Sequence, residues 1–221
     1  MSKRSAAAAG LVAASFAFAA VAWAQGATKT YTDPQNRFSF SYPASLPVET
    51  AANPNQPVNI LVGAADYECK MFVVERPENA SASPDAVVRA YSAVVAGDAW
   101  KRTADGFNID RKQATVQATS VDTAKFWPVQ RADMRTSSGR PLLAAMHARG
   151  GFEVWQFCTD YDNRDHTAVF NQIISSFSGP NDAALQAQAE ASTADRAARK
   201  AANDAAAAAA AEKQKKQKKK N

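Results

Sequence analysis

The chain has 221 residues, of which 46% are hydrophobic and 21% are charged, and it holds only two cysteines. This composition excludes a disulfide-rich miniprotein, a collagen-like chain, a wholly disordered chain and a multi-span membrane protein. The net charge of +5 belongs to the two ends, because residues 25–180 hold fifteen basic and sixteen acidic side chains. A nucleic-acid-binding domain is expected to carry a basic surface on its fold. The charge distribution therefore argues against a specific nucleic-acid partner.

The first 24 residues have the pattern of a bacterial export signal. Lys3 and Arg4 form a short basic region, an apolar Ala-rich stretch follows, and Ala22-Trp23-Ala24 is the pattern that signal peptidase accepts. We expect cleavage after Ala24 and a periplasmic or secreted mature protein with no transmembrane span. The alternative is an uncleaved anchor helix, because about twenty apolar residues are long enough to cross a bilayer.

Residues 25–180 are predicted to form one domain that starts with strands. Phe38, Phe40 and Tyr42 alternate with polar residues, which predicts a half-buried strand. Strands are expected, in chain order, at 37–42, 59–64, 68–75, 129–136, 141–149 and 152–159, and residues 115–121 are a further candidate. Ser83-Pro84-Asp85 has the composition of a helix start, and Gly97 is expected to end that helix.

The second half of this domain predicts a meander followed by a helix. Short turns, including Gly150-Gly151, separate the last three strands, which favours antiparallel pairing. Asp162 and Asn163 are expected to cap a final helix, and Gly179-Pro180 to end it. The apolar face of that helix holds Val169, Phe170, Ile173, Ile174 and Phe177. Two helices and about six strands predict an α+β domain with a largely antiparallel sheet.

The order of these parts resembles the PsbP-like superfamily, including its bacterial DcrB-like members. The resemblance covers about residues 31–178. It rests on the strand Phe38-Ser39-Phe40-Ser41-Tyr42-Pro43, the helix beginning Ser83-Pro84, the late meander and the helix Phe170-Asn171-Gln172-Ile173-Ile174-Ser175-Ser176-Phe177. It implies an α/β/α sandwich in which helices flank the sheet, and a role as a binding or assembly module of exported complexes. It implies no site residues for this chain.

The two cysteines, Cys69 and Cys158, are expected to pair. An even number of cysteines in an oxidising compartment favours a disulfide, and the alternative is two free buried thiols. The chain has no CxxC motif and no histidine at ligand spacing, so a zinc site is not supported. We expect no cofactor.

The sequence offers little support for catalysis. It lacks the nucleophile-elbow, zincin, dinucleotide and phosphate-loop motifs. His147 is predicted to be a packed or an edge-strand residue, and His166 to be solvated at a helix start. An EF-hand loop that began at Asp160 would need a glycine at its sixth position and a glutamate at its twelfth, and the chain has neither there. The acidic run 160–165 therefore predicts helix capping and no metal. We therefore expect no catalytic residue; the alternative is a small periplasmic hydrolase that uses His147 or His166.

Aromatic side chains form the first candidate binding set. Phe126 and Trp127 precede a strand and are the best candidates for the rim of a pocket, and Trp155 is a further candidate. Core packing is the alternative for all three. If they line a pocket, the protein is a small-molecule binder.

Residues 181–221 form the second candidate set, as an Ala/Lys-rich tail that is either a single helix or disordered. The tail has seventeen alanines and no heptad of large apolar residues, so we expect no face that docks. Its basic cluster consists of Lys213, Lys215, Lys216, Lys218, Lys219 and Lys220. We hypothesise that this cluster contacts an anionic surface or partner, and the alternative is a solubilising appendage. The prediction is an exported, non-enzymatic binding or assembly module of the bacterial cell envelope that serves a protein partner or envelope component.

Overall fold

The computed structural model describes residues 27–53, 56–162 and 164–218 of the chain. The predicted leader, residues 1–24, lies outside this range, as do Asn163, Lys219 and Lys220. Among the residues that are described, no helix is long and apolar enough to cross a membrane.

A seven-stranded antiparallel sheet forms the centre of the domain, with the strand order β3-β4-β5-β9-β8-β7-β6. Its strands are β3 (Val48–Asn53), β4 (Gln56–Gly63), β5 (Tyr67–Glu75), β6 (Thr115–Asp122), β7 (Val129–Arg135), β8 (Pro141–Arg149) and β9 (Phe152–Asp160). A separate antiparallel pair joins β1 (Thr28–Thr32) to β2 (Ser39–Pro43). The predicted meander of three strands, β7, β8 and β9, is confirmed. It also includes β6, which pairs with β7, so the meander has one strand more than the sequence predicted.

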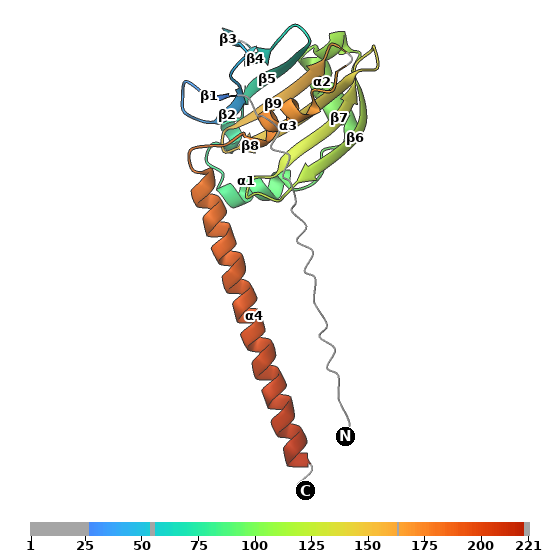
Figure 1. Cartoon of the computed structure of the whole chain (residues 1–221). Helices are drawn as coiled ribbons and strands as arrows, with labels where there is room; N and C mark the ends of the chain where they lie inside the picture. The colour runs from blue at the N-terminus through green and yellow to red at the C-terminus, as the bar shows by residue number, and fades with distance from the viewer. Residues whose placement is uncertain (1–26, 54–55, 163, 219–221) are drawn as a thin grey trace, which may run out of the picture.

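Helices cover both faces of this sheet, which confirms the predicted sandwich (Figure 1). The helices are α1 (Pro84–Tyr91), α2 (Gly97–Gly106), α3 (Thr167–Ser175) and α4 (Asp182–Lys218), with short 3-10 turns at Pro77–Asn79 and Ile109–Lys112. α3 and the β1–β2 pair pack on one face, whereas α1 and α2 pack on the other. α4 extends away from the domain (Figure 1).

The central strand β9 is buried along its whole length because it contributes to two cores. Val154 and Cys158 face the core under α3, whereas Trp155 and Phe157 face the core under α1 and α2. A strand buried on both faces carries apolar residues on both, and in β9 the polar Glu153 and Gln156 interrupt that run. The expected face of Phe38, Phe40 and Tyr42 is also buried.

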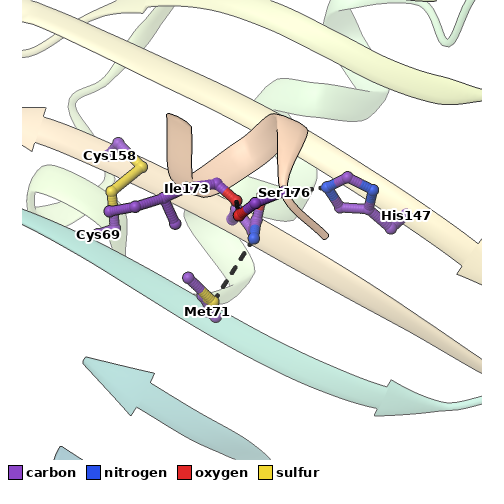
Figure 2. Close-up of a disulfide and its surroundings, with 7 residues drawn as sticks. Cys69, Met71, His147, Cys158, Ile173 and Ser176 are labelled. Atoms are coloured by element: carbon purple, nitrogen blue, oxygen red, sulfur yellow. Dashed lines mark hydrogen bonds between the residues drawn. A yellow bond between two sulfur atoms is a disulfide. The ribbon is translucent and has the colours of Figure 1, made fainter. Parts of the chain in front are cut away.

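The predicted disulfide is confirmed. Cys69 of β5 and Cys158 of β9 occupy paired positions in adjacent strands and are joined by their sulfurs. Both are fully buried under α3, where Ile173 lies close to the bridge (Figure 2).

The prediction of one helix from Ser83 to Gly97 is wrong. Ser83 does cap α1 by accepting a hydrogen bond from the Ala86 amide, but the helix ends at Tyr91 and Gly97 begins α2. The buried amide of Gln130 explains the break. It donates to the carbonyls of Tyr91 and Ala93 and accepts from the Val95 amide, so it takes the groups that a longer helix would have used.

The predicted start of the last helix is also wrong. Asp162 accepts a hydrogen bond from the Arg164 amide, whereas α3 begins at Thr167. Asp165 accepts from the Thr167 amide next to that start. An acidic run offers several local caps, and the short turns before α3 use the earlier ones.

Candidate functional site

A cavity of about 360 Å³ lies on the α3 face of the sheet, next to the beginning of α4. It is bounded by the ends of β7 and β8, the segment between β6 and β7, the end of α3 and the first two turns of α4. Its lining residues are Asp122, Lys125, Phe126, Trp127, Val129, Arg131, His147, Arg149, Ile174, Ser175, Phe177, Ser178, Asp182, Ala183 and Gln186. Most of the exposed lining is apolar, which is typical of small-molecule sites.

Strand alternation brings the polar side chains of the sheet into this cavity. Arg131 of β7 lies two residues after Val129, and Arg149 of β8 lies two residues after His147, so each pair shares a face. Val129 and His147 are partners in the register of these two strands. The cavity therefore lies over the α3 side of the β7–β8 ladder.

Arg149 is the central charged group of the site. Its side chain is largely buried, and its guanidinium lies 4.7 Å from the ring centroid of Trp127 and 5.3 Å from that of Phe177. Nη1 donates to the Ala148 carbonyl at 2.8 Å, and Nη2 donates to Asp182 at 2.7 Å. Burial lowers the pKa of Arg149, and the Asp182 carboxylate opposes that effect.

Asp182, the first residue of α4, connects this helix to the domain. Its carboxylate accepts hydrogen bonds from Nη2 of Arg149, from Nε1 of Trp127 at 2.8 Å and from the Gly179 amide at 2.8 Å. A carboxylate at a helix start is also favoured by the helix dipole. The start of α4 is thus fixed against the cavity by charge-assisted hydrogen bonds.

His147 closes the floor of the cavity as a neutral imidazole. It is 1% exposed, stacks on Phe177 with ring centroids 4.1 Å apart, and shares a 3.1 Å hydrogen bond with Gln156. Burial and the nearby charge of Arg149 lower its pKa to about 3. The sequence prediction of a packed strand histidine is therefore confirmed. His147 lies on the same face of the sheet as the disulfide (Figure 2).

The structure brings together two of the three predicted aromatic residues. Phe126 and Trp127 line the cavity, and their rings form an edge contact at 5.0 Å. Trp155 lies in the core on the opposite face of the sheet, where it packs against Trp100 and donates to Glu153 at 2.8 Å. The cavity rim therefore involves the segment before β7 and not β9.

The predicted tail is helical over Asp182–Lys218, and its first turns dock, contrary to the expectation that no face would do so. Leu185 packs against the core under α1 and α2, and Gln186 accepts a hydrogen bond from the Phe126 amide. The expectation considered large apolar residues only, whereas polar contacts hold most of this junction. Lys213, Lys215, Lys216 and Lys218 lie within α4 near its far end.

A second polar cluster surrounds His166, which is packed and not solvated as the sequence predicted. Its Nδ1 lies 2.5 Å from an Asp160 oxygen, its Nε2 lies 3.9 Å from Asp66, and its ring stacks on Tyr67. Among the described residues, Asp66, Asp162 and His166 each place one ligand-type atom within 4.8 Å of the others. No hydroxyl or thiol side chain in the described chain bonds to this imidazole, so the cluster holds an oriented histidine without an aligned nucleophile.

Arg149 and Asp182 are the site residues that the sequence analysis missed. One available signal was the alternation of β8, which places Arg149 on the same face as His147. The other was an acidic residue at the start of an alanine-rich helix. Neither signal reveals that the two residues, 33 positions apart, form an ion pair.

The fold is similar to that of a cyanobacterial protein, CyanoP, the PsbP of Synechocystis sp. PCC 6803. Its solution structure aligns with a TM-score of 0.53 and 16% sequence identity, covering 69% of this chain and 92% of that chain. A crystal structure from Bacteroides thetaiotaomicron VPI-5482 aligns at a TM-score of 0.39 and 12% identity, over 70% of this chain and 48% of that chain. No protein-family model and no curated protein sequence matches the chain. The predicted PsbP-like fold is therefore confirmed, while a DcrB-like placement stays a prediction.

Proposed function

We propose that this protein is an exported, non-enzymatic binding or assembly module of the bacterial cell envelope. In this proposal a nearly neutral PsbP-like domain, residues 25–180, presents a binding site, and a basic helical extension contacts an anionic surface or partner. The leader sequence supports export, and the buried Cys69–Cys158 disulfide supports an oxidising compartment. The mass of the mature N-terminus tests export: a start at Gln25 supports it, and an intact Met1 or Ser2 refutes it.

The non-enzymatic role is supported by the states of the two histidines. His147 is neutral and buried; its hydrogen bond to the uncharged Gln156 raises its pKa by less than burial and Arg149 lower it. His166 is oriented by Asp160 without an aligned hydroxyl or thiol in the described chain. The binding role fits this chemistry better than the hydrolase alternative.

The observation that carries the proposal is the geometry of α4. Its 37 residues extend for about 55 Å. The helix begins at the cavity, which Asp182, Ala183 and Gln186 line, and extends away from the domain (Figure 1). Four of the six lysines of the sequence cluster, Lys213, Lys215, Lys216 and Lys218, lie near its far end, so their charge lies far from the nearly neutral domain. Each basic residue near an anionic membrane contributes about 1 kcal/mol, and salt screens this attraction. A cationic cluster on a long helix therefore suits a tether to an anionic surface.

Co-sedimentation with anionic lipid vesicles tests this tether. The test variant replaces the lysines with glutamine, which keeps the length and helix propensity of the tail. It carries Lys213→Gln, Lys215→Gln, Lys216→Gln, Lys218→Gln, Lys219→Gln and Lys220→Gln. A second variant lacks residues 205–221, and neutral vesicles serve as the control. We expect binding of the unchanged protein to anionic vesicles at low salt and its loss in both variants; equal sedimentation of all three proteins contradicts the proposal.

A further inference from the structure

The cavity beside α4 contains a buried cation whose hydrogen-bonding capacity is incompletely used. Arg149 is only 8% exposed, and its two terminal nitrogens bond to the Ala148 carbonyl and to Asp182. Its Nε is fully buried and has no acceptor among the described residues. A buried donor on a charged group is costly to leave without a partner. Arg149 also lines the cavity, so an anionic oxygen bound there would lie beside a buried cation whose donors are incompletely used.

The charges around the cavity favour a ligand with one negative charge. The lining holds three cationic side chains, Lys125, Arg131 and Arg149, against the carboxylates of Asp122 and Asp182. His147 adds no charge because burial and Arg149 keep it neutral near pH 7. The lining therefore has a formal charge of +1, which a single carboxylate neutralises.

The walls of the cavity favour an apolar body on the same ligand. Phe126, Trp127, Val129, Ile174 and Phe177 line it, and most of its exposed surface is apolar. Its volume of about 360 Å³ corresponds to roughly twelve water volumes at about 30 Å³ each. A ligand of about ten carbons plus a carboxylate therefore matches its size.

From these observations we propose that the cavity beside α4 binds a small apolar monocarboxylate whose carboxylate pairs with Arg149. The ring faces of Trp127 and Phe177 hold the guanidinium in place, and α3 and α4 enclose the apolar body. Asp182 keeps its bonds to Trp127 and to the Gly179 amide when the carboxylate approaches. The carboxylate then neutralises the excess positive charge of the lining.

Isothermal titration calorimetry with two acids and their neutral amides tests the proposal on the purified protein. Decanoate and 4-phenylbutyrate each have about twelve non-hydrogen atoms, which matches the volume of the cavity. Both carry one carboxylate, and comparing them shows whether the cavity prefers an aliphatic or an aromatic body. Decanamide and 4-phenylbutyramide keep the shape and remove the charge. We expect at least one acid to bind about tenfold or more tightly than its amide, because charge-assisted hydrogen bonds are the stronger ones.

Three variants locate the binding. Arg149→Met is expected to weaken acid binding about tenfold or more and to leave amide binding nearly unchanged. Arg102→Met, on the exposed side of α2, is the matched control and is expected to change neither. Ala183 is exposed and lines the cavity, so Ala183→Trp is expected to block acid and amide alike without disturbing the core.

A direct signal comes from the indole resonances of the protein. The Nε1–H of Trp127 bonds to Asp182 beside the cavity, so its NMR signal is expected to shift with acid, while the signal of the buried Trp100 stays in place. Equal affinity for acid and amide overturns the proposal without any variant. Undetectable binding of both acids, or unchanged binding in Ala183→Trp, also overturns it. The proposal extends the binding role proposed above, and since vesicle binding depends on the terminal lysines, the two can fail separately.

Discussion

Acidification is expected to destabilise the fold through His147. The pKa of this histidine is about 3 in the folded protein and 6.5 in a model peptide, because burial and Arg149 oppose its protonation. The unfolded chain therefore takes up this proton first as the pH falls. The associated stability is fully present above pH 6.5 and is lost as the pH decreases toward 3.

The size of this effect follows from the two pKa values. Between them the free energy of unfolding changes by about 1.4 kcal/mol per pH unit. Lowering the pH from 7 to 5 then removes about 2 kcal/mol through His147 alone. This is a large part of the 5–15 kcal/mol that is typical of a folded domain.

Urea unfolding at pH 7, 6 and 5 measures the effect. The test variant is His147→Gln, which keeps an amide for the bond to Gln156 and does not titrate in this range. The control is His166→Gln, at the only other histidine of the chain. We expect the decrease of about 2 kcal/mol in the unchanged protein and in the control, and its disappearance in His147→Gln. Parallel decreases in all three proteins would refute the reasoning.

Three further changes test the contacts that hold the fold. Asp182→Ala leaves the buried Arg149 without its counterion and should cost about 2–4 kcal/mol in urea unfolding, whereas Asp195→Ala, in an exposed pair on the same helix, should cost about 0.5 kcal/mol or less. Replacing Cys69 and Cys158 with alanine should lower the free energy of unfolding by about 4–5 kcal/mol, because the bridge closes a loop of 89 residues. Thiol titration of the unchanged protein should find free thiols only after reduction. Gln130→Ala should cost about 2–3 kcal/mol and increase amide exchange at residues 91–95; exchange as in the unchanged protein would contradict its role.

The sheet and its core were predictable because their signals are local in the sequence. The alternation around Phe40 and the Gly150-Gly151 turn before β9 are each contained within a few residues. The strand β1 (Thr28–Thr32) was missed because it is nearly all exposed, so it lacks a buried face that would produce a pattern. Its partner β2 has a buried face, and the sequence pattern predicted that strand.

The misplaced end of α1 has a long-range cause, because a distant side chain competes with the local helix signals. Gly97 is a reasonable helix end by propensity, yet the helix stops at Tyr91 because Gln130, 39 residues further along, takes its carbonyl. The same reason explains why the cavity was only half predicted. Its aromatic rim lies in one short segment, Phe126-Trp127, whereas its ion pair joins the end of β8 to the start of α4.

This long-range pair also bears on where the folded unit ends. Composition changes at residue 181, where the alanine-rich segment begins, but Asp182 and Gln186 bond to the domain beyond that point. The next turns of α4 are exposed and have helix-internal ion pairs such as Asp195–Arg199. The first two turns of α4 therefore act as a wall of the cavity, and the remainder acts as a spacer. A deletion that begins at residue 181 removes a wall of the cavity together with the terminal lysines, whereas one that begins at residue 205 removes the lysines and leaves that wall in place.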